Sequence, residues 1–256
     1  RYEPDMKASQ VKAVFDNLRD ETVPLVHAIA AQSASVNSDC LRGHFPKDTQ
    51  EAFARRVIER FGYDFSRGRL DYTHHPFCSS FSRDDVRITT RAEEDNLTML
   101  LFSVLHEAGH ALYDQGISPV FERTPLADGA SVSIHESQSR MWENLVGRSR
   151  EFWSHFYPEL QAAFPDTFGA VSLDEFHRAI NKVSPSFIRI QADELTYNLH
   201  IMLRFELEMA LLDGSLQVAD LPDAWNEKMQ SYLGITPPDD AHGVLQDMHW
   251  AAGLVG

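Results

Sequence analysis

Apolar residues recur every three to four positions along most of the chain, which is the pattern of helices with one buried face. The first such stretch covers about residues 6–32, and Pro24 is expected to break or kink it. The next helix is expected to start near Asp48, which can cap it, and to stop at Gly62. The same period predicts further helices over about 94–116, 136–147, 150–163, 172–183, 188–213, 221–233 and 242–252.

A different pattern occupies about residues 63–91. The segments 69–73 and 86–90 are short, alternate in polarity and are bounded by Gly, Ser and Asp. They are the only credible strands, and we expect them to form a small hairpin or sheet beside the helices. Because we find neither a linker nor an internal repeat, the sequence predicts a mainly α fold with residues 1–256 in a single domain.

Composition and charge narrow the classes of function. The 256 residues are 43% hydrophobic and 24% charged, which is ordinary for a globular chain with a sizeable core. No apolar run approaches the roughly 20 residues of a membrane span, and the net charge of −15 without a basic cluster disfavours nucleic acid. Cys40 and Cys78 cannot make a disulfide framework, so with no secretory signal we expect a reducing, cytoplasmic location.

The segment HEAGH at 106–110 is an H-E-x-x-H motif that follows the apolar run 97–105. The spacing of four residues places His106 and His110 on one face of a helix, where both rings can bind one Zn²⁺ at about 2.0–2.1 Å. Glu107 lies beside them and can accept a proton from a water bound to that metal. The alternative is a pair of core histidines whose hydrogen bonds are satisfied by their neighbours.

A catalytic zinc needs a third protein ligand. The metzincin pattern would place a histidine at Gly116, so that class is excluded. Glu136 opens a predicted helix with a mixed polar and aromatic face, and a carboxylate from a second helix is the gluzincin arrangement. Its alternative is a surface pair with Arg140 at i+4, and Glu143 could support the site from behind the ligands. The other acidic side chains considered downstream are Glu122 and Asp128.

Several short motifs together make a specific resemblance. They are HPF at 75–77, DVRIT at 85–89, HEAGH at 106–110, HESQSR at 135–140, IRIQAD at 188–193, ELTYNLH at 194–200 and LQDMHW at 245–250. In this order they make the chain similar to the carboxypeptidase Taq family of zinc metallocarboxypeptidases. The resemblance covers about residues 75–250, and the region before it is less diagnostic.

The resemblance implies that His106, His110 and Glu136 bind the metal, with Glu107 as the catalytic base. The metal would be Zn²⁺, with Co²⁺ as an alternative, and the fold would be that of a helical gluzincin metallopeptidase. The substrate would be a peptide, hydrolysed at its carboxyl terminus, and the protein would be a homodimer.

The same resemblance places His75, Arg189 and His249 at the substrate. Arg189 would hold the terminal carboxylate of a peptide, since a guanidinium can bind it with two hydrogen bonds. The structural alternatives are an ion pair between Arg189 and Asp193 and a loop-capping role for His75. Arg87 and Asp85 of the DVRIT motif could simply hold the strand.

The chain also departs from the family pattern. Family members are roughly twice as long, with a long helical segment before the matched region and a Tyr-Phe-Pro stretch shortly after the position of Gly256. Loss of a Tyr that donates to the oxyanion costs about 10²–10³ in rate, so we expect metal binding with weak turnover. Two other functions remain open: an oligopeptidase of the same gluzincin type, and a catalytically silent metal-binding or interaction module.

Overall fold

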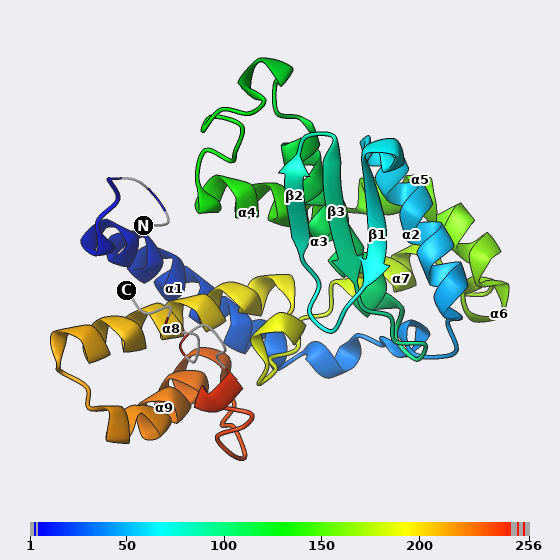
Figure 1. Ribbon diagram of the computed structural model, residues 1–256. Coiled ribbons are helices and arrows are strands. Elements are labelled where there is room, and N and C mark those ends of the chain that lie inside the picture. Colours follow the sequence, from blue (N-terminus) through cyan, green and yellow to red (C-terminus); the bar gives the residue numbers. More distant parts are fainter. Residues whose placement is uncertain (1–2, 4, 247–249, 251–252, 254–256) are drawn as a thin grey trace. The chain divides into compact units, whose positions relative to one another are not determined.

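The computed structural model describes residues 3, 5–246, 250 and 253, which divide into two compact units (Figure 1). Unit 1 comprises residues 1–5 and 37–180, and unit 2 comprises residues 6–36 and 181–256. Most of the described chain is helical, as the hydrophobic period predicts. Among the described helices, none combines the length and the apolar character that crossing a membrane requires.

Unit 1 contains a small sheet and most of the helices. Its elements are α2 (Lys47–Phe61), β1 (Gly68–Tyr72), β2 (Cys78–Ser82), β3 (Asp85–Thr90), α3 (Leu97–Gln115), α4 (Val132–Arg140), α5 (Arg150–Ala163), α6 (Pro165–Phe168) and α7 (Leu173–Ile180). Helix α2 begins one residue before the expected Asp48 and ends, as expected, at Gly62, whose positive φ of 108° suits glycine.

The three strands have the order β1-β3-β2. The two predicted strands are neighbours, but β1 and β3 run parallel, so they form a sheet and not a hairpin with each other. The hairpin partner of β3 is β2, which pairs with it antiparallel. The sequence CSSFS of β2 contains no β-branched residue, and that is why its composition did not reveal a strand.

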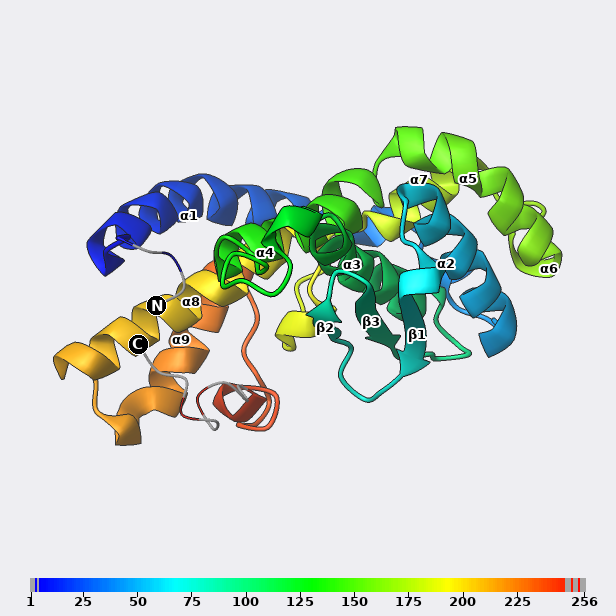
Figure 2. The ribbon, with the colours of Figure 1, turned by 45° about the horizontal axis from the view of Figure 1, so that its top comes forward.

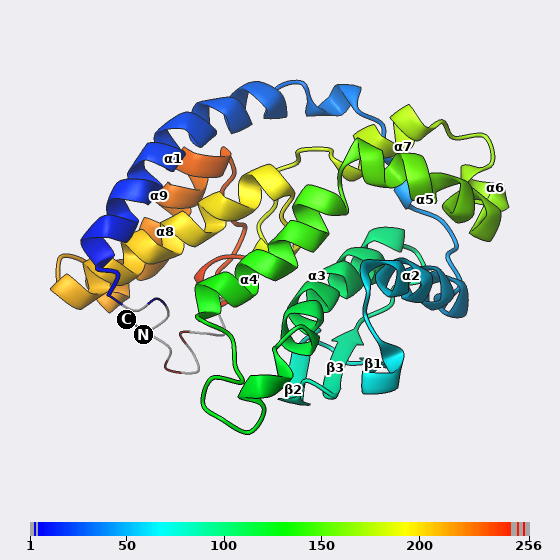
Figure 3. The same cartoon turned by 90° about the horizontal axis from the view of Figure 1, so that it is seen from above.

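Helix α3 lies at the centre of unit 1, packed against the sheet on one side and against α2 and α4 on others (Figures 2 and 3). Asn96 caps its first turn by accepting a hydrogen bond from the backbone N–H of Thr98 at 3.0 Å. Leucine, valine and phenylalanine side chains fill the buried positions of its first half, and this apolar surface continues into the core of unit 1. The second half carries the H-E-x-x-H motif, which is therefore held on a rigid, buried helix.

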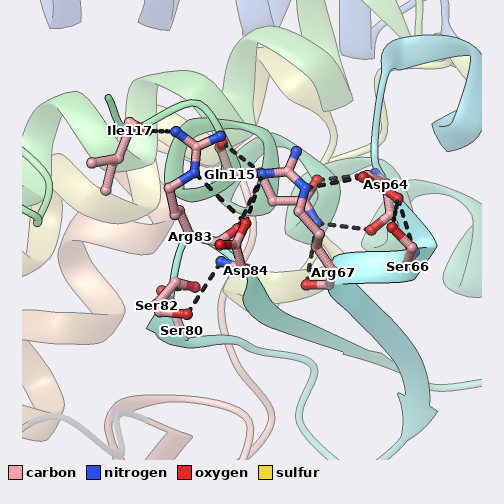
Figure 4. A network of polar contacts seen from close by, with 9 residues as sticks. All are labelled: Asp64, Ser66, Arg67, Ser80, Ser82, Arg83, Asp84, Gln115 and Ile117. Atoms are coloured by element: carbon pink, nitrogen blue, oxygen red, sulfur yellow. Dashed lines mark hydrogen bonds and ion pairs between the residues drawn. The ribbon is translucent and has the colours of Figure 1, made fainter. Parts of the chain in front are cut away.

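The carboxyl end of α3 is fixed by polar contacts to the segment before β1 (Figure 4). The side chain of Gln115 accepts a hydrogen bond from the backbone of Asp64 at 2.9 Å and donates one back at 3.0 Å. Arg67 donates to the backbone carbonyl of Gln115 at 3.2 Å, and Arg83 donates to that of Ile117 at 2.7 Å. Two guanidinium groups thus satisfy carbonyls at the negative end of the helix dipole.

Unit 2 packs α1 (Ala8–Ala30), α8 (Glu194–Asp213) and α9 (Leu221–Leu233) around its own apolar core, which includes the fully buried Trp225. Helix α1 continues through Pro24, so the expected break is not observed. Helix α8 starts later than predicted because Asp193 caps it, accepting from the backbone of Leu195 and Thr196.

The final predicted helix is only partly described. Of the range 242–252, the described part holds a short 3₁₀ turn at Val244–Gln246, and residues 247–249 and 251–252 lie outside the described residues. The segment 188–193 before α8 likewise contains only a 3₁₀ turn at Arg189–Gln191.

Candidate metal centre

Three side chains from α3 and α4 converge with their donor atoms toward one point. The Nε2 atoms of His106 and His110 lie 3.8 and 3.4 Å from Oε2 of Glu136, and all three donor atoms lie within 4.8 Å of one another. Ligand atoms held about 2.0–2.2 Å from a tetrahedral ion are about 3.3–3.6 Å apart. The two imidazoles and one carboxylate could therefore hold a divalent metal with little rearrangement.

Gly109 makes this convergence possible. A Cβ atom at this position would lie 2.5 Å from Cα of Ser139 and 2.6 Å from the carbonyl oxygen of Gln138. These atoms belong to the backbone of α4, so no rotamer change could relieve the clash. The missing side chain in HEAGH lets α4 approach α3 closely enough for Glu136 to reach the two histidines.

His106 is oriented by a carboxylate on its other side. Its Nδ1 lies 2.8 Å from Oε2 of Glu143, and that oxygen also accepts from Arg140 at 3.0 Å. Burial alone lowers the pKa of His106, but the negative charge of Glu143 outweighs burial and raises it. Glu143 lies in a π-helical segment, Met141–Val146, that continues α4.

His110 has a different support. Its Nδ1 lies 2.6 Å from Nδ1 of His135, whose Nε2 in turn lies 3.1 Å from Oδ1 of the buried Asp114. The hydrogen bond to Asp114 raises the pKa of His135. Sequence analysis did not assign a role to either residue, although Asp114 follows His110 by one helical turn and His135 precedes Glu136.

Glu136 also makes the surface pair that was its alternative interpretation, because its Oε1 accepts from Arg140 at 3.3 Å. The two interpretations are compatible, since Oε1 faces the arginine and Oε2 faces the histidines. Burial by itself raises the pKa of Glu136, but His110, His106 and Arg140 together lower it to about 2. Its carboxylate is therefore ionised, as a metal ligand must be.

Glu107 is buried beside this site, with 6% of its surface exposed. Among the residues that the structure describes, none donates a hydrogen bond to its carboxylate. Burial raises the pKa of Glu107 to about 7, with the charges of Glu136 and Glu143 acting in the same direction. A carboxyl group that can both take up and release a proton near neutrality fits a general base.

The other predicted site residues are placed as follows. His75 is exposed in the loop between β1 and β2, and His249 lies outside the described residues. Asp85 and Arg87 pair with each other on the surface of β3 at 2.7 Å, which agrees with a role in holding the strand. Glu122 and Asp128 are not part of the cluster of metal-type donors found in the described chain.

Arg189 belongs to unit 2 and lies in the 3₁₀ turn before α8. Its guanidinium donates to the hydroxyl of Tyr197, and its backbone N–H donates to Gln246 at 3.1 Å. Asp193 is used as the helix cap and makes no ion pair with Arg189 in the described structure. The structural alternative for Arg189, the pair with Asp193, is therefore wrong.

Comparison with known proteins gives one family. A family model described as carboxypeptidase Taq (M32) metallopeptidase matches residues 1–256. Carboxypeptidase 1 of Bacillus subtilis is 45% identical over 255 residues, and thermostable carboxypeptidase 1 of Thermus thermophilus is 47% identical over 255 residues. Each alignment covers 100% of this chain but only 51% and 50% of the relative, so the chain spans about half the length of these relatives.

Solved structures agree with this result. The M32 carboxypeptidase from Deinococcus radiodurans superposes with a TM-score of 0.95 at 50% identity, over 97% of this chain and 50% of that one. Metallocarboxypeptidase 1 of Trypanosoma cruzi gives a TM-score of 0.93 at 40% identity, over 99% and 51% of the two chains. The helical fold with its small sheet is thus similar to half of each of these structures.

Proposed function

Since the chain belongs to the carboxypeptidase Taq (M32) metallopeptidase family, we propose that it carries the metal centre of a metallocarboxypeptidase that removes residues from the carboxyl ends of peptides. The observation that carries the proposal is the convergence of His106, His110 and Glu136 next to the buried Glu107. We propose that residues 1–256 act as one catalytic domain.

We propose that His106, His110 and Glu136 hold a divalent metal, with Zn²⁺ favoured over Co²⁺. Two imidazole nitrogens and one carboxylate are a common ligand set of catalytic zinc. When bound, such an ion polarises a peptide carbonyl and lowers the pKa of a coordinated water. Arg140 and Glu143 keep the ligands in place, because Arg140 bridges the carboxylates of Glu136 and Glu143.

Glu107 is proposed as the group that moves the proton. Its carboxylate takes a proton from the attacking water and then delivers it to the nitrogen of the departing amino acid. A pKa of about 7 suits both transfers, since neither direction is strongly uphill near neutral pH. The walls around this carboxylate are formed by α3 and α4, so few water molecules compete for its proton.

Arg189 and His75 are proposed to bind the peptide, together with His249. Arg189 offers a guanidinium that is not engaged by Asp193, and it could pair with a terminal carboxylate through two hydrogen bonds. His75 is exposed in its loop and could donate to the peptide backbone. Selection of a free carboxylate distinguishes a carboxypeptidase from an oligopeptidase that cuts internally.

The test combines metal analysis with two kinds of substrate. The purified chain is expected to bind one Zn²⁺ and to hydrolyse blocked dipeptides with a free carboxyl terminus, but not their amidated forms, and a chelator should abolish hydrolysis. Glu107→Gln should keep the metal and lose hydrolysis, whereas His106→Ala should lose the metal. Equal cleavage of amidated peptides would favour the oligopeptidase, and metal binding without any cleavage would favour the silent module.

Two further properties are proposed. We propose a cytoplasmic protein, supported by the free thiols of Cys40 and Cys78. We also propose a homodimer, which light scattering at tens of micromolar chain would test; a monomeric mass would contradict it.

A further inference from the structure

The ring of His135 contacts the proposed metal ligand His110 on the side that faces away from Glu136. The two Nδ1 atoms are 2.6 Å apart, while Nε2 of His110 is directed at Glu136. A ring that uses Nε2 for a metal has only Nδ1 left for orientation. His135 is therefore the group that determines how His110 is turned.

The short distance between the two Nδ1 atoms leaves room for one proton. If Nε2 of His110 offers its lone pair to a metal, the proton of this ring must sit on Nδ1 and be donated to His135. Nδ1 of His135 is then an acceptor, and the single proton of a neutral His135 must sit on Nε2.

Asp114 lies where that second proton is needed. Its Oδ1 is 3.1 Å from Nε2 of His135, and the side chain is only 7% exposed. His110 and Asp114 are one turn apart on α3, so both ends of the His135 ring are bound by the same helix. A carboxylate can only accept, which fixes the direction of both hydrogen bonds.

The ring is also confined on its other sides. The edge of Tyr113 contacts it at a centroid distance of 5.1 Å and an angle of 80°. A Cβ atom at Gly129 would lie 2.8 Å from Cδ2 of His135, so the loop backbone closes against the ring. The orientation of His135 is therefore set by packing as well as by hydrogen bonds.

We propose that His135 is a positioning residue for the metal centre: Asp114 fixes its tautomer, and His135 in turn holds His110 with the Nε2 lone pair directed at the metal. The inference rests on the proposed function, because it requires that His110 is a ligand. Partners behind a ligating histidine contribute about 10–100-fold to metal affinity when they are removed singly.

The experiment compares zinc affinity, measured by competition with a chromophoric chelator, in four proteins. His135→Phe keeps a ring but removes the acceptor, and it is expected to weaken zinc binding about 10–100-fold. His135→Asn places an amide oxygen close to the position of Nδ1 and should restore a large part of the affinity. His155→Phe makes the same exchange at an exposed position of α5 and should leave the affinity of the starting protein unchanged.

A second readout needs no metal. Long-range ¹H–¹⁵N spectra of the metal-free chain at pH 8 report which nitrogen of each ring carries the proton. In the starting protein His110 should be protonated on Nδ1 and His135 on Nε2, and in His135→Phe the preference of His110 should disappear. Circular dichroism and thermal unfolding verify that each variant is folded.

The outcomes separate the two proposals. A starting protein that takes up no zinc overturns the proposed function. A starting protein that binds zinc, with His135→Phe binding it equally well, overturns only the role of His135. The same holds if His135→Asn is as weak as His135→Phe, because the acceptor would then not be what matters.

Discussion

Unit 1 and unit 2 place buried histidines in opposite surroundings. In unit 1, His106 and His135 each have a carboxylate within hydrogen-bond distance, and the pKa of each is raised. In unit 2, His200 is fully buried in α8 and neither ring nitrogen has a hydrogen-bond partner. Burial, with Arg204 and Arg189 nearby, lowers the pKa of His200 to about 3.

The difference shows what a carboxylate partner adds to a buried imidazole. A histidine with such a partner has a defined tautomer and orientation, and it remains a polar group that can bind a metal. A histidine without one stays neutral and packs like an aromatic hydrocarbon, at the cost of unmade hydrogen bonds. Burial alone therefore does not identify a functional histidine in this chain; the groups behind the ring do.

The largest effect is expected from Gly109→Ala. The new methyl group would clash with the backbone of α4, so the two helices must move apart and the donors of unit 1 separate. We expect about 3 kcal/mol lower stability, from overpacking that exceeds the roughly 1 kcal/mol gained in helix propensity, and more than 100-fold weaker zinc binding.

Urea unfolding and zinc competition measure the two losses for Gly109→Ala. A second exchange, Ala163→Gly at the end of α5, serves as the control for glycine and alanine in a helix of the same unit. Unchanged zinc affinity in Gly109→Ala would mean that the close approach of α3 and α4 is not needed for the site.

A smaller effect is expected from Glu143→Gln, which removes the charge behind His106 but keeps an acceptor oxygen. Zinc affinity should fall about 10-fold, since the histidine loses a charged partner and Arg140 loses one of its two carboxylates. Glu151→Gln, on the exposed surface of α5, is the matched control. Equal affinity in both variants would remove Glu143 from the support of the metal centre.

The smallest effect tests the histidine of unit 2. The folded pKa of His200 is about 3 and its unfolded pKa is about 6.5, so the unfolded chain binds a proton that the folded chain refuses. The resulting stability is fully present above pH 6.5 and is lost as the pH falls toward 3, by about 1.4 kcal/mol per pH unit.

His200→Leu should remove this contribution and flatten the pH dependence of the free energy of unfolding between pH 6 and 4. The exchange gives up no hydrogen bond of the ring, so stability at pH 8 should change little. His155→Leu, at an exposed position, should retain the full slope. The same slope in all three proteins would show that His200 is protonated as easily in the folded chain as in the unfolded one.

Sequence reasoning reached the helices, the H-E-x-x-H helix and Glu136, because each depends on local spacing or on a contiguous motif. The parallel pairing of β1 with β3 was not predictable in the same way, since strand direction depends on how the intervening β2 folds back. The contact between His110 and His135 joins residues 25 positions apart. Only the packing of α4 on α3, made possible by Gly109, brings them together.

The boundaries that were missed also have local causes. Residues 188–193 carry helix-forming side chains, yet Asp193 satisfies the first N–H groups of α8 and so starts the helix there. Pro24 was expected to break α1, but the helix is held along its length by α8 and α9, and tertiary packing outweighs the lost hydrogen bond.

The π-helical segment Met141–Val146 makes the number of residues, and not only their identity, part of the design of unit 1. A π turn holds one residue more than the α turn it replaces, and here Leu145 is 69% exposed. Deleting Leu145 would remove little buried surface, yet it would rotate all that follows by about 100° around the helix axis. Arg148, which stacks on Phe102 and donates to the carbonyl of Ile180, would then point elsewhere. A one-residue gap at this place in an alignment therefore marks a different arrangement of unit 1, whereas substitutions at Leu145 leave it intact.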